Sequence, residues 1–191
     1  MSIRSILTPF GGVLLVVCVL TGCQSSKPQA PSGGTRVEST RNNCYSLLHQ
    51  VLDAQKDVSL LRFIKREEAD VKSLVKRIAA NSAAGAKLLE EYARHDPLLN
   101  LNDERLPPGE EATREAIAST KKKELLGQTG AEFELSLLLT QTEALTYAWH
   151  LAKVASENES QPDRARALAG VSEDMEKLYH EAVVLLLSKT K

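Results

Sequence analysis

The feature that most constrains the fold is the spacing of apolar residues near the C-terminus. They recur in steps of three and four at Leu168, Val171, Met175, Leu178, Ala182 and Leu185. Because an α-helix has about 3.6 residues per turn, this spacing places one apolar stripe along a helix. Such a stripe must be buried against other helices, so a bundle is predicted. The stretch from Val183 to Leu187 is apolar on nearly every side, and we expect neighbouring helices to cover it.

Similar apolar spacing predicts three further core helices and one extra helix. The core helices are expected at residues from about 41 to 66, 69 to 95 and 131 to 157, and the extra short helix at about 110 to 126. Asp96-Pro97, the Gly127 to Gly130 segment and Pro162 separate or start these elements. With no strand-like alternation, the sequence predicts an all-α fold. The favoured architecture is an antiparallel four-helix bundle with an extra short helix before the third core helix.

One face of the second predicted helix lacks bulky side chains. Asn81, Ser82 and Gly85 fall on its apolar stripe, where a bundle normally places large residues. Either a large side chain from a facing helix or water with polar contacts fills this gap. Tyr147 and Trp149 could line a pocket there, although ordinary core packing is favoured for them.

The N-terminus has the pattern of a secretory signal peptide, called the leader below. Arg4 is followed by a short apolar run that Pro9, Gly11 and Gly12 interrupt, so the run is a poor membrane span. Leu20-Thr21-Gly22-Cys23, at the end of this run, resembles the lipobox of bacterial lipoproteins. The resemblance implies that residues 1–22 are a signal peptide and that Cys23 is diacylated on sulfur. An ordinary signal peptide that happens to contain a Cys is the alternative.

The residues after Cys23 are expected to form a tether. Residues 23–40 are rich in Ser, Pro and Gly, which predicts a flexible segment of roughly 23 Å root-mean-square length. Residues 41–191 then form the helical domain. In Gram-negative lipoproteins, an Asp directly after the lipidated Cys retains the protein at the inner membrane. This chain has Gln24 at that position, so the resemblance implies transport to the outer membrane.

Composition excludes some partners and leaves one thiol to explain. The chain has 24 basic and 25 acidic residues, a balance that argues against nucleic-acid binding. Lys121-Lys122-Lys123 could touch anionic headgroups, but a solvated helix face is favoured.

Cys44 has no intramolecular partner once Cys18 and Cys23 are assigned to the leader and the lipid. Near a helix start its pKa could be lowered, which would suit an intermolecular disulfide or a reactive thiol, but a small, half-buried apolar role is favoured.

Three short motifs resemble a family of exported bacterial proteins. They are Ala69-Asp70-Val71-Lys72-Ser73-Leu74, Gly130-Ala131-Glu132-Phe133-Glu134 and Leu178-Tyr179-His180-Glu181-Ala182. The family is ferritin-like and is described as outer membrane proteins or domains of unknown function; the resemblance covers about residues 45 to 188. It implies a ferritin-like bundle. The family commonly has Asp-His where this chain has Asn81-Ser82 and a His where it has Leu145, and only His180 keeps its place.

The sequence contains few residues in the spacing of known catalytic or metal-binding motifs. No Glu stands three residues before any of the four histidines, as ferritin-like metal sites require. Glu91-His95 and Glu176-His180 are spaced four apart, so each pair shares a helix face, and Glu176 with His180 is a weak metal candidate. Solvated surface pairs are favoured for both. No phosphate loop, nucleophile elbow or Cys-x-x-Cys motif is present, so neither an enzyme nor a cofactor is predicted.

The sequence therefore predicts a lipid-anchored envelope lipoprotein without enzymatic activity. We expect Cys23 to hold it at the membrane, most simply the outer membrane facing the periplasm, and the helical domain to act on other envelope proteins or the wall. The alternative is a ferritin-like domain that binds a metal or small ligand within the bundle and serves a stress or redox role.

Overall fold

A computed structural model of the chain describes residues 33–58, 68–103 and 106–190. The described residues do not include the predicted leader, Cys18, Cys23, Gln24 or most of the expected tether. The last part of the first predicted helix, from residue 59 to 66, also lies outside them.

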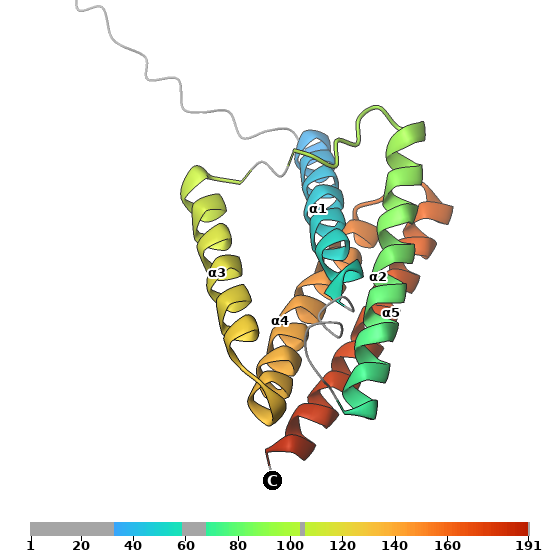
Figure 1. Cartoon of the computed structure of the whole chain (residues 1–191). Helices are drawn as coiled ribbons and strands as arrows, with labels where there is room; N and C mark the ends of the chain where they lie inside the picture. Colours follow the sequence, from blue (N-terminus) through green and yellow to red (C-terminus); the bar gives the residue numbers. More distant parts are fainter. Residues whose placement is uncertain (1–32, 59–67, 104–105, 191) are drawn as a thin grey trace, which may run out of the picture. The chain divides into compact units, whose positions relative to one another are not determined.

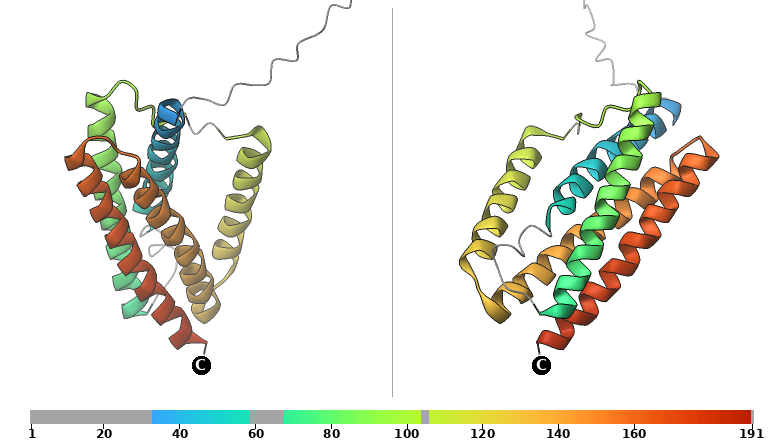
Figure 2. Two further views of the ribbon diagram at one scale, coloured as in Figure 1. Left: turned by 180° about the vertical axis from the view of Figure 1, so that it is seen from behind. Right: turned by 45° about the vertical axis from the view of Figure 1, so that its right-hand side comes forward.

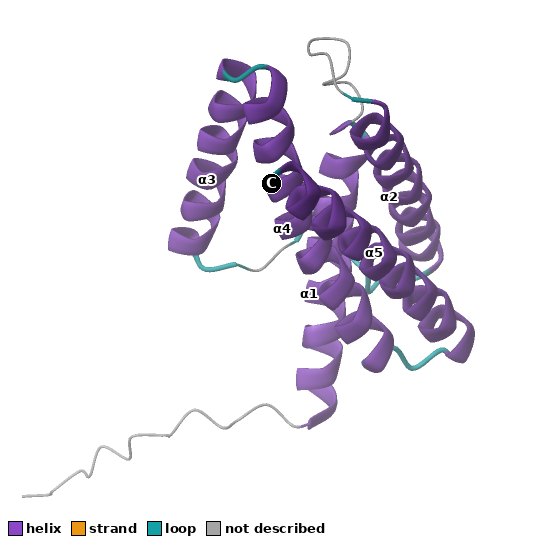
Figure 3. Ribbon diagram, turned by 90° about the horizontal axis from the view of Figure 1, so that it is seen from below, coloured by secondary structure: helices purple, strands orange, loops and turns teal. Residues whose placement is uncertain are grey.

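The described residues are helical and contain no strand (Figures 1 and 3). Five helices follow in the order α1 (Gly33–Lys56), α2 (Ala69–His95), α3 (Pro108–Gly127), α4 (Gly130–Glu157) and α5 (Pro162–Lys189). The prediction of an all-α chain is confirmed. No helix in this part of the chain combines the length and the apolar character needed to cross a membrane.

Four of the helices contact one another in a closed series. α1 packs on α2 and α4, and α5 packs on the same two helices, with α4 and α5 making the most extensive pair. α3 packs against α4, and the two views of Figure 2 show it diverging from α4 away from their junction. The bend between α3 and α4 uses Gly130, whose φ of 58° lies in the left-handed region that glycine adopts without strain.

The core is built from the predicted apolar stripes. On α5 the side chains of Leu168, Met175, Leu178 and Ala182 are buried, as their spacing predicts. The largest fully buried side chains elsewhere belong to all three other core helices and are Tyr45, Leu48, Leu52, Leu74, Ile78, Leu89, Phe133, Leu137, Leu138 and Leu145. Burial of this apolar surface provides the main favourable contribution to folding.

Two expectations about the ends of helices are wrong. α1 begins at Gly33 rather than at about residue 41, so residues 33–40 are helical and not a flexible tether. Once a helix has nucleated, each added residue gains a hydrogen bond, so a helix can extend beyond its packed region. At the end of α5, Val184 and Leu187 are 67% and 58% exposed, so neighbours do not cover the Val183–Leu187 stretch on every side.

Candidate functional site

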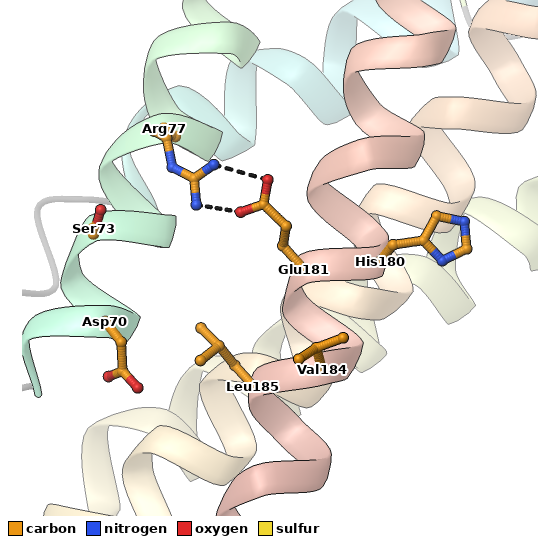
Figure 4. A pocket seen from close by; sticks show the side chains of 7 residues that line it. All are labelled: Asp70, Ser73, Arg77, His180, Glu181, Val184 and Leu185. Carbon is orange, nitrogen blue, oxygen red and sulfur yellow. Dashed lines mark hydrogen bonds and ion pairs between the residues drawn. The ribbon is translucent and has the colours of Figure 1, made fainter.

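A cleft of about 460 Å³ opens between α2 and α5. Its lining residues come from the first turns of α2 and the last turns of α5: Asp70, Ser73, Arg77, His180, Glu181, Val184 and Leu185. Figure 4 shows Arg77 reaching across to Glu181, and Leu185 directed into the space below this pair. The cleft therefore joins an apolar wall to a fixed pair of opposite charges.

The Arg77–Glu181 pair is a bidentate contact. Arg77 Nη1 donates to Glu181 Oε1 at 2.9 Å, and Nη2 donates to Oε2. The hydrogen bonds from the guanidinium hold the pKa of Glu181 below its usual range. Both side chains are about half exposed, so the pair orients the two helices but adds little stability.

His180 and Glu176, the weak metal candidate, lie as an exposed pair on the surface of α5. Nε2 of His180 lies 3.9 Å from Glu176 Oε1, both side chains are exposed, and no third ligand joins them among the described residues. His95 pairs with Glu91 in a similar exposed way, with Nδ1 3.4 Å from Oε1. Figure 4 shows the His180 ring on the side of α5 away from Arg77.

The ring of His180 instead belongs to an aromatic cluster on α4 and α5. Trp149 lies 4.4 Å from His150, 6.0 Å from Tyr179 and 6.3 Å from His180 between ring centroids. Trp149 and Tyr179 are half-buried, whereas both histidines are exposed. Tyr147 points elsewhere, since its ring receives the guanidinium of Arg114 from α3 at 5.1 Å.

In the small-residue layer of α2, a side chain from α1 occupies the space at Gly85, whereas a hollow of about 190 Å³ lined by Asn81 and Gly85 remains toward α5. A Cβ placed on Gly85 would lie 2.8 Å from Leu52 Cδ1, so the Leu52 side chain occupies the space that a larger residue would take. Ser82 is fully buried, and its hydroxyl has no hydrogen-bond partner. The first of the two predicted alternatives, a large side chain from a facing helix, is therefore the one the structure adopts at Gly85.

A group of metal-ligating side chains that the sequence search missed lies between α1 and α2. His49 and Asp53 of α1 and Glu90 of α2 each offer one ligand atom, and the three atoms lie within 4.8 Å of one another. It is the one such group in the described part of the chain. The i, i+4 spacing of His49 and Asp53 was a visible signal, but Glu90 is far away in sequence and only the packing of α1 on α2 brings it there.

Cys44 is a free thiol inside α1 rather than near its start. It is 8% exposed, and burial raises its pKa. The expectation that the helix dipole lowers this pKa is wrong, because α1 begins well before Cys44 and the side chain faces the core. A raised pKa reduces the thiolate fraction on which thiol reactivity depends.

One end of α5 carries a buried polar cluster centred on Glu159. Tyr45 donates its hydroxyl to Glu159 Oε2 at 2.6 Å, and Arg41 Nη1 lies 3.9 Å from Oε1 of the same fully buried side chain. Burial and the hydrogen bond to Glu159 strongly raise the pKa of Tyr45. Nearby, Arg164 donates to Asp96 at 2.9 Å and so ties the start of α5 to the end of α2.

The other end of α5 carries a second cluster centred on Lys189. Its Nζ lies 2.7 Å from Glu68, 2.9 Å from Glu134 and 3.6 Å from Asp70. Burial lowers the pKa of Lys189, but the hydrogen bonds to Glu68 and Glu134 outweigh this and raise it. Because each charge in both clusters has partners, we interpret them as structural clamps rather than as reacting groups.

The predicted basic run behaves as a helix surface. Lys121 is partly buried and pairs with Glu143 of α4 at 3.3 Å, whereas Lys122 and Lys123 are exposed. The contact helps to hold α3 beside α4. Headgroup binding by this run stays a prediction.

Comparison with known proteins gives no relative from which to transfer a function. No protein family matches the chain, and no curated protein or solved structure matches it at a significant level.

Proposed function

We propose that this chain is a lipoprotein of the cell envelope whose helical domain binds other envelope components rather than catalysing a reaction. The lipid on Cys23 would hold it at the outer membrane, with the domain facing the periplasm. The observation that carries the proposal is Leu20-Thr21-Gly22-Cys23 at the end of a basic and apolar leader. Two acyl chains on one residue are sufficient for stable anchoring.

We also propose that α1, α2, α4 and α5 form an antiparallel, ferritin-like four-helix bundle to which α3 is added. The closed series of contacts supports this arrangement. So do the terminal contacts of α5, whose start binds Asp96 at the end of α2 and whose Lys189 binds Glu68 just before α2. A bifunctional maleimide should link Arg77→Cys to Glu181→Cys but not Arg77→Cys to Asp163→Cys. Equal linking of the two pairs would contradict the antiparallel arrangement.

The surface at the end of α5 supports an interaction role. Val184 and Leu187 are large, exposed and apolar, and Val184 lines the cleft beside the Arg77–Glu181 pair. Exposed apolar side chains that are grouped on one surface and rimmed by polar groups can mark a site that binds another protein. We therefore expect the partner to contact the last turns of α5.

Anchoring is tested by metabolic labelling with a fatty-acid analogue followed by membrane fractionation. Cys23→Ser should abolish the label and leave the leader uncleaved, and Cys18→Ser, five residues away in the leader, should label normally. Label retained in Cys23→Ser would overturn the lipoprotein assignment.

The interaction role is tested by site-specific photo-cross-linking in native envelopes. A photoreactive residue at Val184 or Leu187 should give a discrete product, and Val184→Asp should reduce the product formed from Leu187. Ile117 of α3, which is also exposed and apolar, is the control position and should give none. Absence of any reproducible product at α5 would count against this role.

A second candidate function is binding of a small ligand in the α2–α5 cleft. Its volume falls in the range of ligand pockets, and it combines an apolar wall with the Arg77 guanidinium, a partner for an anionic group. This places the ligand-binding alternative at a surface cleft rather than within the bundle. Amphipathic carboxylates should then raise the Tm of the wild-type chain and not that of Arg77→Gln, and equal shifts would exclude this cleft.

A further inference from the structure

Three side chains of suitable chemistry converge where α1 meets α2. His49 and Asp53 lie one turn apart on the same face of α1, and Glu90 approaches from α2. The side chain of His49 is 18% exposed and Nε2 lies 3.3 Å from Glu90 Oε1. The imidazole is thus held in place by the packing, whereas the two carboxylates retain access to water.

The spacing of these atoms suits a small tetrahedral ion. Zinc bonds of about 2.0–2.2 Å at tetrahedral angles place neighbouring ligand atoms roughly 3.3–3.6 Å apart. His49 Nε2 and Glu90 Oε1 already have that separation. Asp53 is the ligand that must turn, and its half-exposed side chain is free of the core.

The charges around the group also favour a cation. Lys56 is paired with Asp53, and its ammonium is attracted by Asp57 and Glu90 as well. Among the described residues, three carboxylates thus act on one ammonium, which is an excess of negative charge beside the imidazole. A divalent ion would neutralise that excess and release Lys56 from Asp53.

We propose that His49, Asp53 and Glu90 bind one divalent transition-metal ion, with zinc as the favoured metal. An imidazole ligand selects zinc, copper or nickel over calcium or magnesium, which prefer oxygen donors. The three protein ligands leave a fourth position for water or for a group from a partner. Because α1 and α2 both contribute ligands, the bound ion joins these two helices. This site goes beyond the proposed anchoring and interaction role, and it differs from the Glu176–His180 pair that the sequence suggested.

The chain supplies its own matched controls. Glu91 with His95 and Glu176 with His180 are also Glu/His pairs at i, i+4 on helices, but neither pair has a third ligand in the described residues. If any exposed Glu/His pair were enough for zinc, these pairs would bind it equally well. If three converging ligands are needed, only the group at α1 and α2 will bind tightly.

The test is a zinc titration of the full chain in detergent after removal of metals, with competition against a chromophoric chelator. Cys18 and Cys23 are replaced by Ser throughout so that their thiols cannot bind zinc. One zinc per chain is expected. Changing groups outside the direct ligands already weakens metal affinity 10–100-fold in known sites, so His49→Ala and Glu90→Gln should each weaken it at least about tenfold. His95→Ala and His180→Ala should leave it unchanged.

Two further measurements keep the proposal falsifiable if His49→Ala disturbs packing. Lys56→Gln removes the competing cation and should tighten zinc binding, whereas a purely structural effect would not. Cobalt in the same site should show d–d absorption without a thiolate charge-transfer band. Zinc binding that is absent, or that is equal in wild type, Glu90→Gln and His180→Ala, would overturn the proposal.

Discussion

Replacement of Gly85 by Ala tests whether the Leu52 side chain sets the spacing of α1 and α2. Gly85 lies within α2, so its added methyl group would point at Leu52 Cδ1 from 2.8 Å and at Val171 Cγ1 from 3.7 Å. The first separation is too short for two carbon atoms. Leu52 is fully buried, so it can move only by displacing other core side chains.

Two effects oppose each other in this variant. Alanine improves helix propensity over glycine by about 1 kcal/mol. Overpacking of a filled core costs about 1–3 kcal/mol. The packing cost should therefore win, with a net loss of up to about 2 kcal/mol in the free energy of unfolding.

Gly170 provides the control, because it lies within α5 and has open space around its Cβ position. Gly170→Ala should gain the propensity term alone, about 0.5–1 kcal/mol. Urea unfolding followed by circular dichroism measures both variants, and their difference should be about 1–3 kcal/mol. In a double-mutant cycle, Leu52→Val should relieve part of the Gly85→Ala loss. Equal stabilisation by the two glycine replacements would refute the packing argument.

Three other predictions concern the polar clusters at Glu159 and at Lys189, and the membrane to which the protein is sorted. Tyr45→Phe removes the hydroxyl that donates to Oε2 of the buried Glu159, whose Oε1 keeps the Gln161 N–H, and should cost about 1–3 kcal/mol in urea unfolding. Because the pKa of Tyr45 is raised in the folded state, wild-type stability should fall as pH rises above about 10, and the variant should lose less. Lys189→Met leaves the buried Glu134 carboxylate without its cation, although the Glu68 N–H still donates to it, and should cost about 3 kcal/mol. The raised pKa of Lys189 means that its contribution is fully present below about pH 10 and is lost only as pH rises further, which unfolding at stepped pH will show. Gln24→Asp should move the acylated protein from the outer to the inner membrane in density-gradient fractionation, and an unchanged distribution would contradict the sorting argument.

Helix boundaries marked by local chemistry could be predicted from the sequence. α2 has the expected bounds because proline disfavours helix in the residue before it. The break before Gly130 and the start at Pro162 were found in the same way. The start of α1 could not be found, because helix extension past the packed region needs no special residue. The exposure of Val184 could not be predicted either, because the apolar spacing along a helix does not determine how much of that helix its neighbours bury.

The candidate metal-binding groups depend on contacts between helices, which the spacing of residues within one helix does not reveal. Glu176 and His180 share a helix face as their spacing requires, yet nothing brings a third ligand to them among the described residues. His49 and Asp53 show an equally ordinary spacing, and what distinguishes them is Glu90 on the neighbouring helix. The proposed metal site therefore depends on the register of two helices, because α1 carries two of its three ligands and α2 carries the third.

That register and the packing at Gly85 are linked. Leu52 lies one turn after His49 on α1, and Gly85 precedes Glu90 by little more than a turn on α2. The glycine lets Leu52 approach the α2 backbone closely, and the same approach keeps His49 Nε2 within 3.3 Å of Glu90 Oε1. A methyl group at Gly85 that pushes Leu52 away also moves the α1 ligands from the α2 ligand. Unfolding and zinc titration of Gly85→Ala thus report on one helix spacing, and a variant that loses stability but keeps full zinc affinity would show that the ligands adjust independently of the core.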